Sequence, residues 1–389
     1  MRVLQLVTLF TPQGDFGGPA RVAINQTREL RSKGVDVTLI AGSRGFGPQD
    51  GEEIDGVSVK LFRSLRLGPK ARFASLCSPS LILWLIKNIR HADIVHIHLS
   101  RDLISLPAAL IALAWSKPLV VQPHGTISPT KNLLAKALDK IATLRVLKFA
   151  HTVFYLSPQE KQSLVGMPAS SSFKLAILPN GIPQGHIAST SASKSPDILF
   201  LARLNARKRP EHFVQMSIAL KDLYPDATFS LVGPDGGMAK QIRQMIEGTA
   251  NNASIRSEGS LPPGQTLQRM ARSSVYVLPA IDEPFGMTVI EALSCGVPVV
   301  ITDSCALASM VREERCGIVT DGSLEQLIAA VAALLDDPAQ ATEMGQRGQA
   351  AVSEHYGMDK VANILKDTYA ASIADHDGRR QKAGKMVVS

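Results

Sequence analysis

The stretch DEPFGMTVIEALSCGVPVV, from Asp282 to Val300, holds two glutamates and an apolar run that ends in the β-branched sequence VPVV. A helix that begins near Phe285–Met287 and leads at once into a buried strand is typical of a parallel α/β sheet. Glu283 and Glu291 stand just over two helical turns apart, so both carboxylates lie near one face at two depths. Two acceptors at two depths suit a ligand with two groups of hydroxyls. The alternative, a pair of ordinary surface glutamates, is disfavoured by the apolar residues around them.

The same alternation of short apolar runs and helix-forming segments extends over the rest of the chain. Strands are predicted at 3–10, 35–42, 92–99, 118–125 and 152–157, and again at 197–204, 227–233, 274–280, 297–302 and 317–320. Helices such as 19–33, 103–114, 132–150 and 210–223 separate them. This order predicts an α/β fold of two doubly wound, Rossmann-like domains that face each other across a cleft, with ligands at the carboxyl ends of the strands.

Domain boundaries follow from composition. The small polar residues of STSASKSP, 189–196, make this segment the best linker candidate. We therefore expect an N-terminal domain at 1–188 and a C-terminal domain at 197–358. A last helix at about 359–373 is expected to pack back onto the first domain, and the basic residues 375–389 to form a disordered tail.

Composition limits the class of protein. The chain has 389 residues, 45% of them hydrophobic, and a net charge of +8, which favours anionic partners. The apolar start, MRVLQLVTLF, is too short to span a membrane and has no cleavage pattern, and SLILWLIKNI at 80–89 is also too short. The four cysteines form no CxxC pair. We expect a cytoplasmic protein with reduced thiols.

Three further segments follow predicted strands, where such folds bind ligands. Gly17 and Gly18 belong to a glycine loop before a helix, which suits an anion but lacks the dinucleotide pattern GxGxxG. His124 lies at the end of the segment predicted as strand at 118–125, and Arg203 and Lys208 lie at and just beyond the end of the strand predicted at 197–204. Cations at a strand end suit a pyrophosphate. Taken singly, each segment also has an explanation without a functional role: a flexible turn, a structural histidine and a solvated basic loop, respectively.

Two more histidines, His96 and His98, lie inside a predicted strand and share one face. Their spacing would suit a metal, but no carboxylate or cysteine partner is placed near them in the sequence. We expect at least one to be packed in the core and the other to line the cleft.

Together these segments resemble the retaining glycosyltransferases of family 4, which have the GT-B fold. The resemblance covers nearly the whole chain, in order. It rests on the E-x7-E pair, the R-x4-K pair, the glycine loop, the His-Gly pair and a PNG segment: Glu283 and Glu291, Arg203 and Lys208, Gly17 and Gly18, His124 and Gly125, and Pro179, Asn180 and Gly181. One departure is the sequence DSCALASMV after the strand at 297–302, where the family often has a Gly-Gly-x-x-Glu loop.

The resemblance implies a role for each matched position. The first domain would bind the acceptor and the second a nucleotide-sugar, with Arg203 and Lys208 on the diphosphate and Glu291 on the ribose. His124 would lie by the transferred sugar and, with Glu283, Arg203 and Lys208, form the catalytic set. The implied donor-binding set is Gly17, Gly18, Arg203, Lys208, Phe285, Gly286, Met287, Thr288 and Glu291. No cofactor and no essential metal are expected, and retention is attributed to front-face attack in which the leaving phosphate takes the acceptor proton.

The acceptor is expected on the first domain, which is basic in one place. Lys60, Arg63, Arg66, Lys70 and Arg72 alternate with apolar residues and precede SLILWLIKNI. This pattern suits an anionic membrane surface and a lipid-linked acceptor, as in bacterial surface polysaccharide or glycolipid assembly, with the enzyme peripheral at the inner face of the membrane. The alternative is a solvated strand and loop before a core helix, with a soluble glycan as acceptor.

Three rival functions are weaker. A nucleotide-sugar epimerase of the same architecture is disfavoured by E-x7-E after ARLNARK. A nucleic-acid-binding protein would gather basic and aromatic residues on one surface, whereas here aromatics are 5% of the chain and charge is dispersed. A nicotinamide oxidoreductase is disfavoured by the missing fingerprint.

Overall fold

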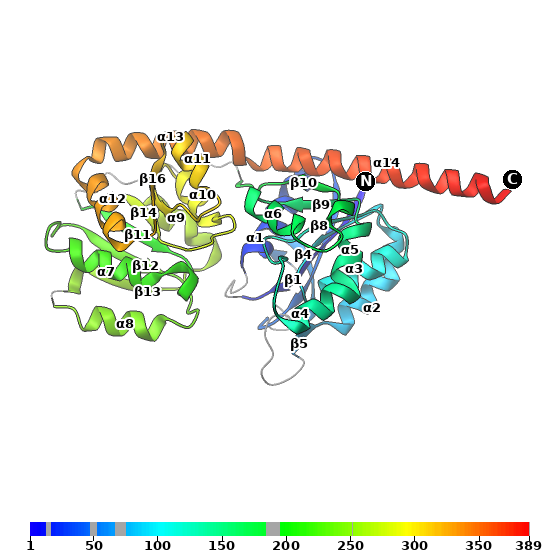
Figure 1. Cartoon of the computed structure of the whole chain (residues 1–389), viewed down its shortest axis with the longest axis horizontal. Helices are drawn as coiled ribbons and strands as arrows, with labels where there is room; N and C mark the ends of the chain where they lie inside the picture. The colour runs from blue at the N-terminus through cyan, green and yellow to red at the C-terminus, as the bar shows by residue number, and fades with distance from the viewer. Residues whose placement is uncertain (13–16, 47–52, 67–74, 184–194, 251, 389) are drawn as a thin grey trace. The chain divides into compact units, whose positions relative to one another are not determined.

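The computed structural model describes residues 1–12, 17–46, 53–66, 75–183, 195–250 and 252–388 (Figure 1). The chain forms two compact units, Met1–Pro183 with Met358–Ser389 and Gln184–Gly357. The linker expected at 189–196 falls mostly outside the described residues.

The first unit is built on a sheet in the order β10-β9-β8-β7-β1-β2-β4-β3, parallel except for β3. Its strands are β1 (Arg2–Phe10), β2 (Asp36–Ser43), β3 (Glu53–Ile54), β4 (Val57–Arg63), β7 (Ile94–His98), β8 (Leu119–Gln122), β9 (Thr152–Tyr155) and β10 (Leu175–Ile177). Separately, β5 (Leu65–Arg66) pairs antiparallel with β6 (Leu76–Cys77). Its helices are α1 (Gly17–Ser32), α2 (Pro79–Asn88), α3 (Ser105–Ala114), α4 (Leu133–Leu138), a π-helical turn (Asp139–Thr143), α5 (Leu144–Phe149), α6 (Pro158–Val165) and α14 (Met358–Val388).

The second unit has a fully parallel sheet in the order β13-β12-β11-β14-β15-β16. Its strands are β11 (Asp197–Leu201), β12 (Thr228–Val232), β13 (Ile255–Gly259), β14 (Val275–Leu278), β15 (Val299–Thr302) and β16 (Gly317–Thr320). Its helices are α7 (Pro210–Leu220), α8 (Ala239–Glu247), α9 (Thr266–Ala271), α10 (Met287–Ser294), α11 (Ala308–Glu313), α12 (Leu324–Asp336) and α13 (Pro338–Tyr356).

Both sheets have the doubly wound order, which confirms the predicted fold class of two Rossmann-like α/β domains. The strand order reverses direction between β1 and β7 in the first unit and between β11 and β14 in the second. In doubly wound sheets this switch point opens a crevice at the carboxyl ends of the strands, and ligands bind there. The candidate site residues of each unit are therefore sought in the loops that follow these strands.

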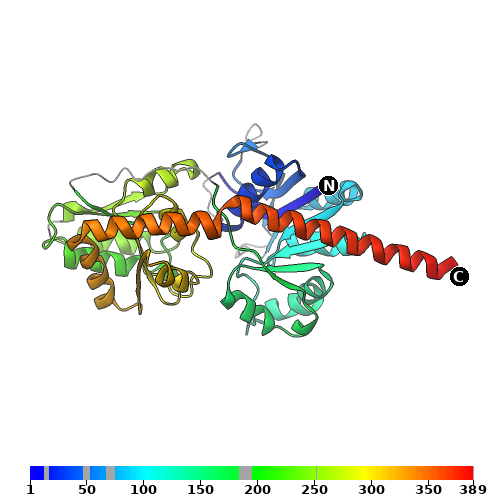
Figure 2. The same ribbon diagram turned by 90° about the horizontal axis from the view of Figure 1, so that it is seen from above.

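Helix α14 belongs to the first unit, along which it lies in Figure 2. Its apolar residues, Met358, Val361, Leu365 and Tyr369 among them, pack into one core with Val3 of β1 and with α1. In the structure the helix continues as far as Val388, over residues where the sequence predicts a disordered tail, 375–389. Asp375 pairs with Arg379 one turn on and with Lys174, and these contacts support helix where composition alone suggested disorder.

Candidate functional site

In the second unit, the loops after β11 and β14 are neighbours because the two strands pair with each other. The ammonium of Lys208, from the first loop, forms an ion pair with the Glu283 carboxylate from the second. Their side chains are only 14% and 8% exposed. The sequence separates these residues by 75 positions, and the switch point of the sheet brings them together.

The loop that carries Arg203 and Lys208 is held by its neighbours. The Asn205 side chain accepts a hydrogen bond from the Lys208 backbone N–H (3.2 Å) and so caps the short 3-10 turn Ala206–Lys208. The segment GPDGG, 233–237, packs so closely underneath that a Cβ on Gly236 would lie 2.8 Å from Cγ of Arg203. Sequence reasoning missed this support, although two adjacent glycines after a strand are a signal of close backbone approach.

The segment DEPFG turns sharply before helix α10. Gly286 has a φ of +85°, and a Cβ there would lie 3.1 Å from a methyl group of Val289. The N–H of Gly286 donates to Glu283 Oε1 (3.1 Å), so this carboxylate is held by an amide on one oxygen and an ammonium on the other. The backbone of Ala306, in the unusual DSCALASMV loop, donates to the Glu283 carbonyl oxygen (3.0 Å). That loop therefore braces the turn.

The second glutamate of the pair, Glu291, is 4% exposed on α10. The buried Tyr276 hydroxyl is hydrogen-bonded to Thr288 Oγ1 (2.6 Å) and to the Leu201 carbonyl oxygen (3.1 Å). Burial raises the pKa of Tyr276 well above its ordinary value, and the negative charges of Glu291 and Glu283 raise it further. Both carboxylates therefore lie close enough to the Tyr276 hydroxyl to raise its pKa.

Phe285 and Met287 flank this turn. Phe285 is 4% exposed and its ring packs edge-on against Tyr356 (5.8 Å between centroids, 73°). Its side chain is a core group, so only its backbone is left for a ligand. Met287 is half-buried and begins α10, as the sequence predicts.

In the first unit, Gly17 and Gly18 are the first two residues of α1, which follows β1 at the switch point. A Cβ on Gly18 would meet nothing within 4 Å. The preceding residues of the glycine loop, 13–16, lie outside the described part of the chain.

His124 sits in a strained turn after β8. Its φ is +54°, and that of Gly125 is +73°. The N–H of Gly125 donates to one carboxylate oxygen of Glu160, and the N–H of Leu156 donates to the other (2.6 Å). Burial raises the pKa of Glu160, which these hydrogen bonds lower. Glu160 was not predicted; the only signal is its place in SPQE, where Ser157 caps α6.

A chain of buried side chains leads to His124. His98 Nδ1 lies 2.6 Å from His124 Nε2, and the two rings are almost parallel (8°). On its other nitrogen, His98 Nε2 lies 2.8 Å from the amide nitrogen of Gln5. Gln5 is fixed in turn, because its amide nitrogen donates to Gln26 and its oxygen accepts from Thr27.

This chain sets the tautomers of both histidines. Burial lowers the pKa of His98 well below its ordinary value and that of His124 to about 3, so both rings are neutral at neutral pH. An amide nitrogen can only donate, which leaves His98 Nε2 as acceptor and puts the proton on Nδ1. His98 therefore donates to His124 Nε2, and His124 carries its own proton on Nδ1. His124 is built as a neutral hydrogen-bond donor.

The prediction that one histidine of the pair His96 and His98 lines a cleft is wrong. Both are buried, at 0% and 2% exposure, because β7 is covered on both faces. His96 Nδ1 is hydrogen-bonded to the hydroxyl of Tyr369 on α14 (2.6 Å). His98 instead forms a hydrogen bond with His124.

The predicted cationic patch lies on β4 and β5. Lys60, Arg63 and Arg66 are exposed, and the Lys60 ammonium lies 5.8 Å from the centre of the Trp84 ring on α2. Lys70 and Arg72 fall outside the described residues. Among the helices that the structure describes, none combines the length and the apolar character needed to cross a bilayer. Within the same residues, no three His, Cys, Asp or Glu side chains gather as a metal site would require.

Comparison with known proteins agrees with this architecture. Residues 16–184 match the model of Glycosyltransferase Family 4, and residues 184–351 match that of Glycosyl transferases group 1. The D-inositol 3-phosphate glycosyltransferase of an Arthrobacter species is 24% identical over 95% of this chain and 94% of its own length, and that of Paenarthrobacter aurescens is 25% identical over 93% and 94%.

Solved structures share the fold. HepE of Anabaena, in complex with UDP and glucose, superposes with a TM-score of 0.73 at 17% identity, over 95% of this chain and 99% of that one. TarM of S. aureus, in a complex that contains UDP, superposes with a TM-score of 0.75 at 10% identity, over 95% and 99%. Because two consecutive glycosyltransferase models cover residues 16–351, Glycosyltransferase Family 4 in the first unit and Glycosyl transferases group 1 in the second, the chain belongs to the glycosyltransferases that carry these two domains.

Proposed function

We propose that the protein transfers a sugar from a nucleotide-diphosphate sugar to a glycan or lipid-linked acceptor, with retention of anomeric configuration and without an essential metal ion. The observation that carries the proposal is the buried pair of Lys208 and Glu283 at the switch point, next to the N-terminus of α10. A cation there can take the charge that develops on a leaving diphosphate. A solved structure with the same fold contains UDP, which supports a nucleotide-sugar donor, and relatives named as inositol 3-phosphate glycosyltransferases support sugar transfer.

Binding of the donor would replace the ion pair between Lys208 and Glu283 by contacts of each side chain with the donor. Glu283 is bonded to Lys208 and to the amide of Gly286, and these are the groups proposed to bind diphosphate and sugar. When a diphosphate takes Lys208, the Glu283 carboxylate becomes available to sugar hydroxyls. Arg203 would share the diphosphate, and Glu291 and Thr288 would bind the ribose side of the donor.

The first unit would contact the sugar and diphosphate of the donor and would also bind the acceptor. His124, as a neutral donor through Nδ1, would hold an oxygen of the transferred sugar, and Gly18 leaves room for a diphosphate to approach the start of α1. The exposed cations Lys60, Arg63 and Arg66 are proposed to contact an anionic acceptor or membrane. Assembly of a bacterial surface polysaccharide or glycolipid is the process proposed for this activity.

A thermal-shift panel of UDP-, GDP-, ADP- and dTDP-sugars, with and without EDTA, tests the donor. A ligand at 100 times its dissociation constant adds about 2.7 kcal/mol of stability. We expect one nucleotide family to raise the melting temperature equally in EDTA, and a shift that EDTA abolishes would overturn metal independence. With that donor, NMR of the product formed on inositol phosphate or a lipid-linked glycan then reports acceptor class and anomeric configuration. Loss of transfer with both acceptors despite donor binding would refute the acceptor proposal.

A further inference from the structure

A continuous helical segment of the first unit, formed by α4, the π-helical turn and α5, carries an unusual surface. Leu133, Leu134 and Ile141 are 80%, 79% and 71% exposed. Exposed single leucines are ordinary in proteins, but three of the most exposed apolar side chains of the described chain occur here within nine residues. At about 100° per residue, Leu133, Leu134, Ala137 and Ile141 fall within an arc of about 100°. They form one apolar stripe.

The charges of the same segment have one sign. Its exposed charged residues are Lys131, Lys136, Lys140, Arg145 and Lys148. The one acidic residue between 131 and 149, Asp139, is buried and paired with Arg101 (2.8 Å). Lys136 and Lys140 flank the apolar stripe on one side, where their long side chains can reach outward from an apolar layer. An apolar stripe edged with lysines is the pattern of a helix that lies in a lipid interface.

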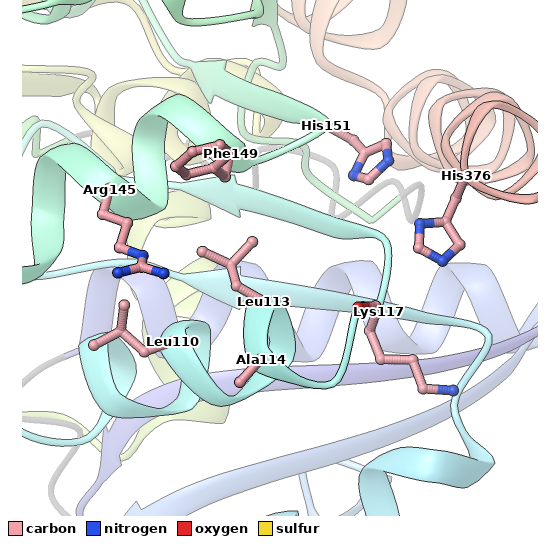
Figure 3. Close-up of a pocket in the computed structure, with 9 residues that line it drawn as sticks. Leu110, Leu113, Ala114, Lys117, Arg145, Phe149, His151 and His376 are labelled. Atoms are coloured by element: carbon pink, nitrogen blue, oxygen red, sulfur yellow. The ribbon is translucent and has the colours of Figure 1, made fainter. Parts of the chain in front are cut away.

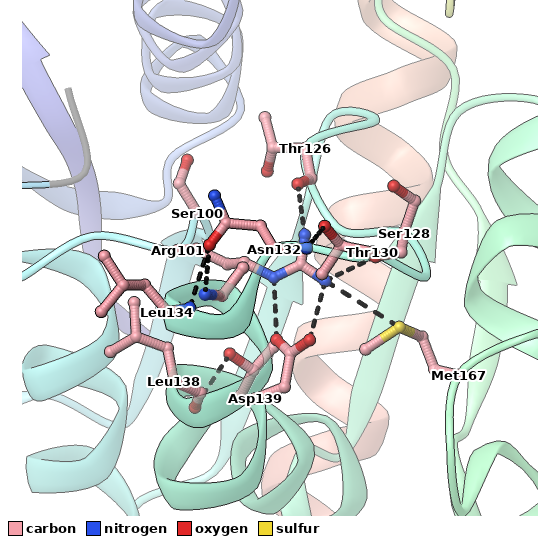
Figure 4. Close-up of polar contacts among 12 residues, drawn as sticks. Ser100, Arg101, Thr126, Ser128, Thr130, Asn132, Leu134, Leu138, Asp139 and Met167 are labelled. Atoms are coloured by element: carbon pink, nitrogen blue, oxygen red, sulfur yellow. Dashed lines mark hydrogen bonds and ion pairs between the residues drawn. The ribbon is translucent and has the colours of Figure 1, made fainter. Parts of the chain in front are cut away.

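The segment is anchored to the loop that carries His124. Arg101 donates to both oxygens of Asp139, to the Ser128 carbonyl oxygen (2.6 Å) and to the Thr126 carbonyl oxygen (3.2 Å) (Figure 4). A single guanidinium therefore joins the helix to the turn two residues after His124. A surface that binds this helical segment would therefore be held at a fixed position relative to the turn that carries His124.

The carboxyl end of the segment, in α5, also combines exposed apolar side chains with cations. A hollow of about 540 Å³ is lined by residues of α3, α5 and α14. Figure 3 shows the apolar side chains of Leu110, Leu113 and Phe149 and the cations Arg145 and Lys117 around it. Phe149 is 55% exposed. The mixture of apolar and cationic groups thus extends from Lys131 to Phe149.

We propose that residues 131–149 dock the enzyme on the surface of an anionic membrane. A second copy of the chain is the poorer occupant, because a two-fold contact would set this cationic surface against itself. An anionic lipid surface matches both the charge and the apolar stripe. This surface is separate from the patch at Lys60, Arg63 and Arg66. Docking there would also bring the enzyme to a lipid-linked acceptor, and that consequence alone rests on the proposed function.

Sedimentation of the full chain with vesicles of phosphatidylcholine containing 30% phosphatidylglycerol tests the proposal. Leu133→Ser/Leu134→Ser/Ile141→Ser and Lys136→Glu/Lys140→Glu should each weaken vesicle binding about tenfold or more. The matched control is Lys240→Glu/Arg243→Glu, which reverses two exposed charges on α8 of the second unit and should bind as the parent protein does. All the substituted side chains are exposed, so circular dichroism should show unchanged folding.

Three results would overturn the proposal. Parent-like binding by both helix variants is the first. Loss of binding only in Lys60→Glu/Arg63→Glu/Arg66→Glu is the second, since it would move the contact to the other patch. A parent dimer that the triple serine variant dissociates, with vesicle binding intact, is the third and would name a second copy as the occupant. Donor thermal shifts measured without vesicles report on the proposed function separately, and they should not change in any helix variant.

Discussion

The candidate site of the first unit is organised by neutral groups, whereas that of the second is organised by charges. His124 is held by a series of hydrogen bonds between neutral groups, in which the Gln5 amide donates to His98 and His98 donates to His124. Lys208 and Glu283 face each other as a nearly buried ion pair. Neutral donors in fixed directions suit the hydroxyls of a sugar, and a cation suits a diphosphate that gains charge as it leaves. On the proposed function, the first unit would hold sugar hydroxyls and the second unit the diphosphate.

Removing the cation should have the largest effect. Lys208→Ala should lower turnover about 100-fold, because a positioned charge at the leaving group is lost. It should also lower stability by about 3 kcal/mol, because the Glu283 carboxylate stays buried without its ammonium partner. Steady-state kinetics and urea unfolding measure the two effects.

A double variant separates them. Lys208→Ala/Glu283→Gln should recover stability but not turnover, since it removes the unpaired charge without restoring the cation. Lys221→Ala, at a lysine of similar exposure on the same unit, is the control and should leave turnover unchanged. Near-normal transfer by Lys208→Ala would show that the second unit does not use the Lys208 charge to stabilise a leaving diphosphate.

Interrupting the neutral chain should have a smaller effect. His98→Phe leaves His124 Nε2 without its donor, so the ring is free to change tautomer, and kcat should fall about tenfold with donor affinity unchanged. The nitrogen-15 NMR signals of His124 should show a proton on Nδ1 in the parent and a mixture in the variant. His96→Phe, which removes a contact to Tyr369 and none to His124, is the matched control. The same His124 spectrum in His98→Phe as in the parent would remove His98 from a positioning role.

Acid should weaken the first unit. The pKa values of His96 and His124 are lowered to about 3 by burial, and that of His98 is also lowered. Unfolded histidines bind protons below about pH 6.5 and these folded ones do not, so stability falls as pH drops from about 6.5 towards 3. The slope is at most about 1.4 kcal/mol per pH unit for each histidine.

Tryptophan fluorescence follows this unit alone, since both tryptophans, Trp84 and Trp115, lie in it. The urea midpoint should drop between pH 7 and pH 5. A variant with His96→Phe and His124→Asn should show a flatter profile. An unchanged midpoint in the parent would contradict the neutral assignment of the histidines.

Substitution of Gly286 or Gly18 by alanine should have the smallest effects. The first change should affect stability, and the second should affect KM for the donor. Gly286→Ala forces a Cβ onto a left-handed backbone and against Val289, so it should cost about 1–2 kcal/mol of stability. Gly18→Ala meets open space and should change stability by less than about 0.5 kcal/mol, while raising KM for the donor if a diphosphate approaches there. Equal melting temperatures for the two variants would contradict the geometry assigned to the α10 turn.

The alternation of apolar strands and helices predicted the fold of both units, and α10 begins at Met287 inside the predicted window. Strand β13 was missed because four of its five residues are exposed and leave no apolar signal. The chain from Gln5 to His98 was also missed, because it joins residues 93 positions apart that only the pairing of β1 with β7 brings together. The ion pair of Asp375 with Lys174 could not be predicted either, because it joins residues 201 positions apart in the sequence.

Hydrogen exchange with and without a nucleotide-diphosphate sugar, measured both in the absence and in the presence of EDTA, tests most directly that the second unit binds the donor through Lys208 and Glu283. We predict slower exchange in the backbone amides of 203–209 and 282–291, and loss of this protection in Lys208→Ala. Protection confined to other segments, or protection that disappears in EDTA, would contradict the assignment of a metal-free donor site to these loops.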